Sequence, residues 1–469
     1  MTKKKFSGAL NFSEFKWIDL KFSDLMGNMH HITLPIKNLD EIRKYGVGFD
    51  SSSCPGFKSV EGGDMVLMID ENTAFNEPFS NEPTVSFFCR VKEADTRKDY
   101  DRDPRGIAAR AEEYLKDQSI GDEILFGPEF EFYVFDRVNV KNSENITECR
   151  IESYEANMSI EKEDVNETGE FLQKKQGYHA MPPKDKFQSL RQEISNAIMN
   201  YGIDLLYHHH EVGAGQNEIE IKRYPLVKTG DNIQIIKYFI KMISYKFELS
   251  ATFMPKPMFN MPGTGMHFHQ HIFKNKKNLF YGDEYGGLSK LAEYYVAGLL
   301  RHGRSLLAFT NPSTNSYKRL VPGFEAPVKL FYSLANRSSA IRIPKYATSE
   351  GEKRIEFRPP DGTANPYLAC AAMLMAGIDG IKNKISLKDN NFGPFDINME
   401  LADKKILDKV KSCPASLQEA LQALKDDNEF LLKGNVFSKQ MIESYIEYKE
   451  REALDMNKRP HPYEFELYF

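Results

Sequence analysis

Acidic and imidazole side chains recur at every second position in four short runs of the sequence. The runs are residues 127–132 (GPEFEF), 208–218 (HHHEVGAGQNE), 265–271 (GMHFHQH) and 354–358 (RIEFR). Because successive side chains of a β-strand point to opposite faces, each run predicts a strand or hairpin with an apolar face and a polar face. One such strand is ordinarily an amphipathic strand facing water. Four of them predict a sheet whose polar face binds cations and phosphate.

The histidine-rich run predicts two strands joined by a short connection. Residues 203–207 before it are mostly apolar, and residues 218–221 after it alternate with period two. This places Glu211 and Glu218 near the turn on neighbouring strands, close enough to share one cation. A surface hairpin with a solvated acidic rim explains this stretch alone equally well.

The side chains on these runs define the chemistry. Five carboxylates and one imidazole are the candidate metal ligands: Glu129, Glu131, Glu211, Glu218, Glu356 and His267. Mg²⁺ prefers oxygen ligands and Mn²⁺ tolerates the histidine, whereas Zn²⁺ usually takes more His or Cys.

Arginines gather in the same part of the chain, within segments that are otherwise apolar or small. They are Arg319, Arg337, Arg342, Arg354 and Arg358. Arginine binds carboxylate and phosphate bidentately, although any single one is more often structural than catalytic. The residues alone therefore indicate ATP- and metal-dependent phosphoryl transfer or a two-metal hydrolase.

Composition narrows the class of protein. The chain has 469 residues, of which 41% are apolar and 28% charged, as in soluble globular proteins of roughly two or three domains. A net charge of -5 argues against nucleic acid as a partner. The basic start lacks a signal peptide's apolar core, and the longest apolar run, residues 367–378, is too short to cross a membrane. Five scattered cysteines predict a reducing compartment, the cytoplasm.

The remaining sequence supplies elements that position these groups. Residues 17–34 predict a hairpin, and short strands are expected near 65–69 and 84–91. Asp103-Pro104 begins a helix, so a domain boundary is placed just before it. Residues 136–176 are polar and weakly periodic and predict a long variable excursion from the core, whereas helices are expected at 186–201 and 231–249.

The combined motifs resemble those of the type I glutamine synthetases of bacteria and archaea, over nearly the whole chain. The motifs are residues 49–53 (FDSSS), 127–131 (GPEFE), 208–212 (HHHEV), 256–259 (KPMF), 263–267 (GTGMH), 315–323 (NSYKRLVPG), 336–338 (NRS) and 365–367 (NPY). The resemblance implies an α+β fold with a small N-terminal β-grasp-like domain, residues 1–101. A large catalytic domain, residues 102–469, would carry an antiparallel sheet whose polar face forms the site, flanking helices and a helical tail.

The same resemblance implies an activity. ATP would drive the ligation of ammonia to the γ-carboxylate of L-glutamate through γ-glutamyl phosphate, giving L-glutamine, ADP and phosphate. Two or three Mg²⁺ or Mn²⁺ ions would be needed in each site. The enzyme would be cytoplasmic, with no nucleic-acid or membrane partner. It would be a homo-oligomer, two stacked hexameric rings with active sites at subunit interfaces.

Residue roles follow from the matched motifs. One metal would take Glu131, Glu211 and Glu218, and the other Glu129, His267 and Glu356. Arg319, Arg358 and Gly263 would bind glutamate, while His269 and Lys256 would contact the nucleotide. Arg337, Arg342 and Arg354 would stabilise phosphate, with Arg342 also touching the nucleotide. Asp50 from a neighbouring subunit would deprotonate ammonium beside Ser53 and Tyr178, and Glu325 would belong to a flap over the intermediate.

Some positions depart from the family pattern and keep alternatives open. Gly62-Gly63 replaces a more polar loop near the ammonium site, Gly263 follows Pro262 where asparagine is commoner, and the tail ends a few residues early. A relative that joins glutamate to a polyamine or ethanolamine is the main alternative, and Asp50 and Tyr178 favour ammonia over it. A non-catalytic structural relative is the third hypothesis.

Overall fold

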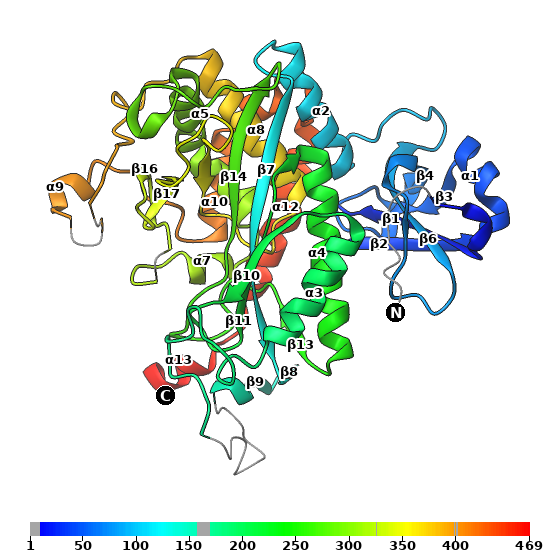
Figure 1. The fold of residues 1–469 in the computed structure, drawn as a ribbon, viewed down its shortest axis with the longest axis horizontal. Helices are drawn as coiled ribbons and strands as arrows, with labels where there is room; N and C mark the ends of the chain where they lie inside the picture. The colour runs from blue at the N-terminus through cyan, green and yellow to red at the C-terminus, as the bar shows by residue number, and fades with distance from the viewer. Residues whose placement is uncertain (1–9, 157–168, 325, 398, 400–401) are drawn as a thin grey trace.

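A small N-terminal lobe lies beside a much larger lobe in the computed structural model, which describes residues 10–156, 169–324, 326–397, 399 and 402–469 (Figure 1). The small lobe carries a sheet of strand order β2–β1–β6–β4–β3, with β5 paired to β6 and with β1 and β6 parallel. Its elements are β1 (Trp17–Ser23), β2 (Met29–Pro35), α1 (Leu39–Tyr45), β3 (Val47–Asp50), β4 (Asp64–Ile69), β5 (Phe75–Asn76) and β6 (Thr84–Glu93). The hairpin and the two short strands predicted here are confirmed.

The large lobe is built on a sheet of order β10–β11–β7–β14–β18–β17–β16. The strands along this path are β7 (Glu123–Phe135), β10 (Leu205–His210), β11 (Gln216–Ile221), β14 (Met266–Lys274), β16 (Lys329–Leu334), β17 (Ser339–Ile343) and β18 (Ile355–Phe357). Short strands β12 (Tyr224–Pro225), β13 (Ser250–Thr252) and β15 (Lys277–Asn278) pair at its margins. Within the described residues its pairings are antiparallel except β16–β17, which is parallel. All four runs with alternating polar residues lie in this sheet.

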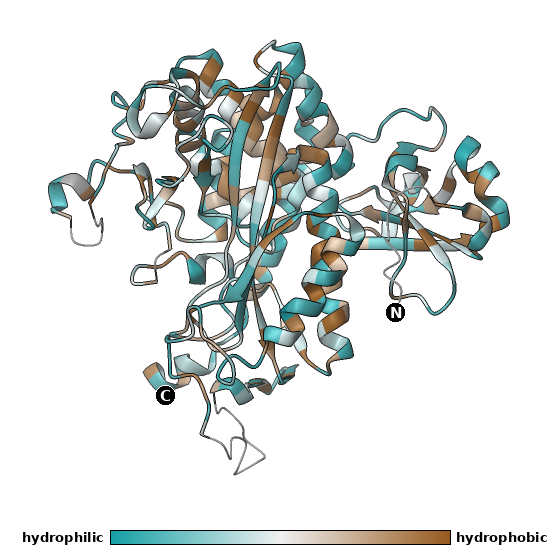
Figure 2. Ribbon diagram, in the orientation of Figure 1, coloured by the Kyte–Doolittle hydropathy of each residue, from teal (hydrophilic) through white to brown (hydrophobic). Residues whose placement is uncertain are grey.

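Alternation along these strands decides which face is buried. Hydrophobic and hydrophilic residues alternate along β7 and β14 (Figure 2). Phe130 and Phe132 of β7 and Met266 and Phe268 of β14 are at most 1% exposed and belong to the main core. The residues between them therefore point to the opposite face of the sheet.

Helices pack against the apolar face and around its ends. The helices are α2 (Pro104–Asp117), α3 (Gln188–Tyr201), α4 (Leu226–Lys246), α5 (Lys290–Arg301), α6 (Gly303–Thr310), α7 (Ser316–Arg319), α8 (Pro366–Lys382), α9 (Lys404–Leu407), α10 (Leu417–Asp426), α11 (Glu429–Leu432), α12 (Lys439–Asn457) and α13 (Pro462–Tyr468). Helix α8 is almost entirely buried and packs against α5 so closely that a Cβ on Gly298 would lie 2.1 Å from the carbonyl oxygen of Ala376. None of the described helices is long and apolar enough to span a membrane.

A buried arginine fastens the two lobes together. Arg105, in the first turn of α2, donates two hydrogen bonds to Asp231 of α4 at 2.9 and 3.0 Å and one to Asp70 of the small lobe at 2.8 Å. The Asp231 carboxylate also accepts the hydroxyl of Tyr367 at 2.7 Å. Removing one partner of such a buried pair leaves an uncompensated charge, so this contact fixes where the small lobe sits.

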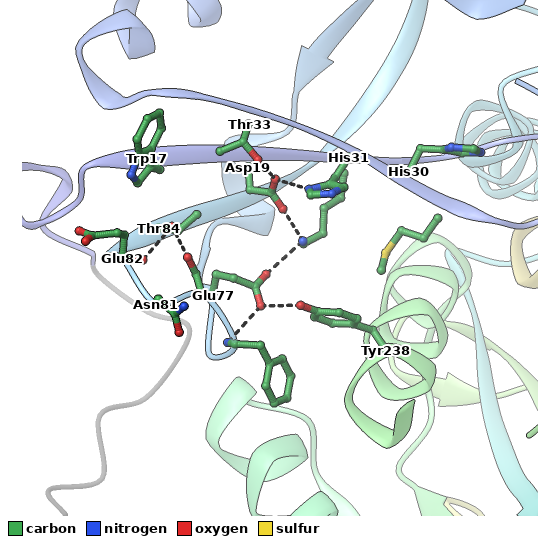
Figure 3. Close-up of a pocket in the computed structure, with 14 residues that line it drawn as sticks. Trp17, Asp19, His30, His31, Thr33, Glu77, Asn81, Glu82, Thr84 and Tyr238 are labelled. Carbon is green, nitrogen blue, oxygen red and sulfur yellow. Dashed lines mark hydrogen bonds and ion pairs between the residues drawn. The ribbon is translucent and has the colours of Figure 1, made fainter. Parts of the chain in front are cut away.

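A second polar network joins the lobes beside a cavity of about 610 Å³ (Figure 3). Lys21 of β1 lies between Asp19 and Glu77, 2.5 and 3.0 Å from their carboxylates, and Tyr238 of α4 donates to Glu77 at 3.1 Å. His31 also contacts Asp19 at 2.7 Å. Every carboxylate oxygen in this network has a partner, so we interpret it as a structural joint.

The first part of the predicted excursion, residues 136–176, forms a hairpin of β8 (Arg137–Ser143) and β9 (Ile146–Glu152), most of whose residues are exposed. One expectation from the sequence needs correction. Helix α4 begins five residues earlier than its predicted start, at Leu226 instead of Asp231. Pro225 immediately precedes it, and the apolar stripe used for prediction only becomes regular after Gly230.

One buried histidine links three helices. His302, between α5 and α6, lies 2.9 and 3.0 Å from the carboxylate oxygens of Asp427 and 3.0 Å from Asp379 at the end of α8. Its ring stacks on Phe430, with 4.0 Å between ring centroids. Burial alone would lower the pKa of His302, but the two carboxylates raise it above its ordinary value of 6.5.

We therefore expect His302→Gln to destabilise the protein by about 1.5 kcal/mol near pH 6, because Asp379 and the partly exposed Asp427 lose their charged hydrogen-bond donor. A raised pKa means that this contribution is complete below pH 6.5 and is lost as pH rises through the raised value. Chemical unfolding from pH 5.5 to 9 measures it. An equal pH dependence in wild type and variant would contradict the assignment.

Candidate active site

The pairing of β7 with β11 and β14 brings the predicted carboxylates together on the polar face of the large sheet. Glu131 of β7 lies opposite Glu218 of β11, and Glu129 lies between Glu220 of β11 and His267 of β14. Pairing across adjacent strands places such side chains within reach of one another. Three acids of β7 and β11 are at least nine-tenths buried there: Glu129, Glu218 and Glu220. Glu129 and Glu220 both approach His269, whereas Glu218 approaches His209.

The neighbouring strands add cationic groups to this face. Glu356 of β18 lies opposite His269 of β14 and Arg342 of β17. Glu356 is fully buried, contacts Arg342 and accepts from Arg358 at 2.6 Å. Arg354 donates to His269 Nδ1 at 3.2 Å, which leaves Nε2 facing Glu129 at 2.8 Å.

Electrostatics divides the face into two halves. Burial would raise the pKa of Glu129, but hydrogen bonds with His267 and His269 hold it well below its ordinary value. Burial would likewise raise the pKa of Glu356, but the positive charges of Arg358, Arg342 and His269 together lower it. Glu129 and Glu356 are therefore carboxylates at neutral pH.

The half that contains Glu211 and Glu218 has less positive charge to offset its carboxylates. Burial, together with the charges of Glu129, Glu131 and Glu211, raises the pKa of Glu218 well above its ordinary value. Burial and the charge of Glu131 also raise the pKa of Glu211. Like-charged carboxylates held this close favour either a bound proton or a bound cation.

Three groups of side chains on this face fit a divalent cation. They are Glu129, His267 and Glu356; Glu129, Glu220 and His269; and His209, Glu211 and Glu218; within each, one ligand atom from every residue lies within 4.8 Å of the others. Oxygen donors with one imidazole are the set that Mg²⁺ and Mn²⁺ accept. Glu131 lies between the groups, 3.6 Å from His267 Nε2, while one of its oxygens accepts from Gly265 N–H at 2.9 Å.

These residues line a cavity of about 530 Å³. Of the predicted site residues, the cavity wall includes Glu129, Glu131, Tyr178, Glu211, Glu218, Gly263, His267, Arg319, Arg337, Arg342 and Arg358. Gly263 is required there, since a Cβ at this position would lie 2.6 Å from Arg319 Cγ and 2.7 Å from the carbonyl oxygen of Pro255. The guanidinium of Arg319 is held in place by a hydrogen bond that it donates to the carbonyl oxygen of Pro359 at 2.7 Å.

Other predicted residues lie elsewhere. His269, Arg354 and Glu356 are behind the cavity wall and act on its residues through the contacts above. Lys256 places its ammonium group over the ring of Phe324, 3.5 Å from the centroid. Asp50 and Ser53 are exposed on the small lobe, where Asp50 lines a separate hollow with residues 60–64. Glu325 lies outside the described residues.

Sequence reasoning missed three members of the site. His209 and Gln216 line the cavity, and Glu220 lies within 4.8 Å of Glu129 and His269 through their ligand atoms. Period-two alternation with Glu218 was the signal for Glu220, and His209 stands inside a motif that had already been singled out.

Carboxylates, imidazoles and arginines that share one enclosed sheet face are typical of enzymes that bind divalent cations and transfer phosphoryl groups. Comparison with known proteins identifies the family. Residues 14–94 match the glutamine synthetase β-grasp domain, and residues 101–468 match the glutamine synthetase catalytic domain. The chain therefore belongs to the glutamine synthetase family and is a ligase with that activity.

Individual relatives are similar in sequence to this chain over nearly its full length. The chain is 45% identical to a glutamine synthetase of Azotobacter vinelandii, covering 97% of each chain, and 44% identical to one of Methylococcus capsulatus, covering 100% of each. Among solved structures, a Plasmodium falciparum glutamine synthetase superposes with a TM-score of 0.89 at 30% identity, covering 98% of this chain and 97% of that one. A chain described as apo GmaS superposes with a TM-score of 0.78 at 24% identity over 96% of each chain, which shows a shared fold.

If Glu218 belongs to a cation site, Glu218→Gln should weaken Mn²⁺ binding by at least about tenfold, because even residues that only support metal ligands contribute that much. Calorimetric titration of metal-stripped protein measures the affinity and the number of ions bound. Glu193→Gln, an exposed change on α3, is the control. Unchanged Mn²⁺ affinity in the Glu218 variant would remove this residue from the site.

Proposed function

We propose that the cavity on the sheet's polar face holds L-glutamate and the ATP phosphates around two divalent cations, and that glutamine forms there through γ-glutamyl phosphate. The observation that carries this proposal is the gathering of such ligand groups on one face, with Glu131 beside Glu218 and His267 and with arginines at the rim. A third ion could accompany the nucleotide.

Each cation would have its own ligands. Glu131, Glu211 and Glu218 would hold the ion that orients glutamate. Glu129, His267 and Glu356 would hold the ion at the ATP phosphates. When bound, such ions neutralise negative charge on carboxylate and phosphate oxygens and so lower the barrier to phosphoryl transfer.

The arginines would handle the anionic substrates. Arg319 and Arg358 bind the glutamate carboxylates, which aims the γ-carboxylate oxygen at the terminal phosphorus of ATP. That oxygen forms the new bond to phosphorus, and the bond to ADP breaks. Arg337 and Arg342 would stabilise the phosphoryl oxygens, and Arg354 would support them through His269. Lys256 and His269 would lie on the nucleotide side. Arg342 already contacts Glu356, so its guanidinium is positioned before substrate binds.

Ammonia then replaces phosphate on the γ-carbonyl carbon. Ammonium has no lone pair, so an anionic group must bind it and take a proton. Hydrogen bonds with Ser52 lower the pKa of Asp50, which keeps this carboxylate ionised. Tyr178 and Ser53 would complete the ammonium pocket, and Glu325 would close over the intermediate.

This pocket requires a second subunit. Asp50 and Tyr178 line different hollows of the same chain. A neighbouring small lobe that presents Asp50 to the cavity brings the two together, as in a closed ring. We therefore propose a homo-oligomer with active sites between subunits.

Two exposed elements fit further contacts between rings. The β8–β9 hairpin exposes Val138, Val140 and Ile146, and α13 with the last residue exposes Phe465 and Phe469. Both lie at the same end of the large lobe (Figure 1). Isolated two-stranded hairpins are only marginally stable in water, so a partner surface would stabilise this one.

With ATP, L-glutamate and Mg²⁺, we expect ammonium to give L-glutamine and phosphate, and ethanolamine or putrescine to give no product. Asp50→Asn should reduce glutamine formation at limiting ammonium by about 100-fold, since general-base catalysis contributes that much or more. ATP affinity should not change. Product masses and phosphate release measure both results, and turnover with the larger amines alone would instead identify a γ-glutamyl-amine ligase.

A mixing experiment shows where Asp50 acts. Asp50→Asn and Glu218→Gln subunits, unfolded and refolded together, should regain activity that neither has alone. In randomly mixed rings about a quarter of the sites combine an intact Asp50 with an intact Glu218 from different subunits. No recovery in mixed oligomers of normal size would place both residues in one subunit's site.

A further inference from the structure

Two lysines share one aromatic ring at the wall of the cavity. Lys256 Nζ lies 3.5 Å and Lys175 Nζ 4.6 Å from the centroid of Phe324. Phe324 and Lys175 both line the cavity that contains the carboxylates. An ammonium group over an aromatic face is attracted to it, more strongly when water is excluded. The lysines therefore fix the orientation of a ring that forms part of the cavity wall.

Lys256 is itself held firmly. Its backbone N–H donates to Asn315 Oδ1 at 2.6 Å, and its carbonyl oxygen accepts from Asn315 Nδ2 at 3.1 Å. Its Nζ donates to the carbonyl oxygen of Met261 at 2.5 Å. The ammonium group thus has a fixed place between the loop before Gly263 and the segment that begins at α7.

The charge of Lys256 is compensated only weakly. Burial, then the positive charges of Lys175 and Arg319, lower the pKa of Lys256 to about 8. Lys175 reaches it from the segment before Gly177, and Arg319 from α7; among the described residues these are the charged groups that act on it.

We propose that Lys256, assisted by Lys175, positions Phe324 as a wall that keeps water from γ-glutamyl phosphate. This inference rests on the proposed function. In the unwanted reaction, the oxygen of water bonds to the γ-carbonyl carbon and the bond from that carbon to the phosphate oxygen breaks. Glutamate and phosphate are released, and one ATP has been converted to ADP without product. Excluding water from a reactive intermediate is a recognised role of closed sites.

The ratio of phosphate released to glutamine formed, at limiting ammonium, reports this role. We expect a ratio near one for the wild type and at least about a twofold rise for Lys256→Met, because a loosened ring admits water. Lys256→Arg, which keeps a cation, should stay near one. Phe324→Leu leaves both lysines in place, and its ratio of phosphate to glutamine should rise as it does in Lys256→Met. Lys184→Met, an exposed change in the same segment as Lys175, is the control.

The pH profile separates this role from a general loss of structure. The wild-type ratio should rise from pH 7 to 9, as Lys256 loses its proton around its pKa of about 8. Lys256→Arg should keep a flat ratio across this range. Ratios that stay at the wild-type value in both Lys256→Met and Phe324→Leu would overturn the proposal. So would a ratio that rises with pH in Lys256→Arg as much as in the wild type. Absence of glutamine from the wild type would instead refute the proposed function.

Discussion

The packing of like-charged carboxylates on one face of a sheet is the constraint on which the rest of the structure depends. Strand pairing fixes Glu131 opposite Glu218 and Glu129 opposite Glu220, so the acids cannot move apart. Histidines and arginines compensate Glu129 and Glu356, whereas Glu211 and Glu218 keep raised pKa values. The second half of the face therefore has a strong electrostatic preference for a cation, and under the proposed function the first half would take the cation that arrives with phosphate.

Holding this arrangement requires a rigid scaffold. The opposite faces of β7 and β14 are buried in a core that includes the almost fully buried helix α8. At its start, Asn365 accepts from Tyr367 N–H at 3.2 Å while its amide donates to carbonyl oxygens of Asp24 and Leu25 in the small lobe. The helix that supports the sheet is thus tied to the lobe that carries Asp50. Because that aspartate lines a hollow separate from its own subunit's cavity, rigidity within one subunit would serve catalysis in the next under the proposed function.

Alternation with period two was sufficient to predict the site strands and which of their side chains share a face. It could not give register, because pairing depends on residues far apart in the sequence; the parallel β16–β17 pair and the position of Glu220 beside Glu129 and His269 emerged only from the structure. The β8–β9 hairpin escaped prediction because all of β8 and most of β9 lack the buried face on which such patterns depend. Motif resemblance assigned Lys256 to the nucleotide, and its contact with Phe324 required three-dimensional coordinates.

Diffraction from crystals grown with Mn²⁺ and collected at a wavelength where manganese scatters anomalously tests the central claim most directly. The account predicts two peaks in every subunit, one among Glu131, Glu211 and Glu218 and the other among Glu129, His267 and Glu356. A single peak, or peaks away from the polar face of the sheet, would contradict it. The carboxylates would then be held together by protons instead of cations.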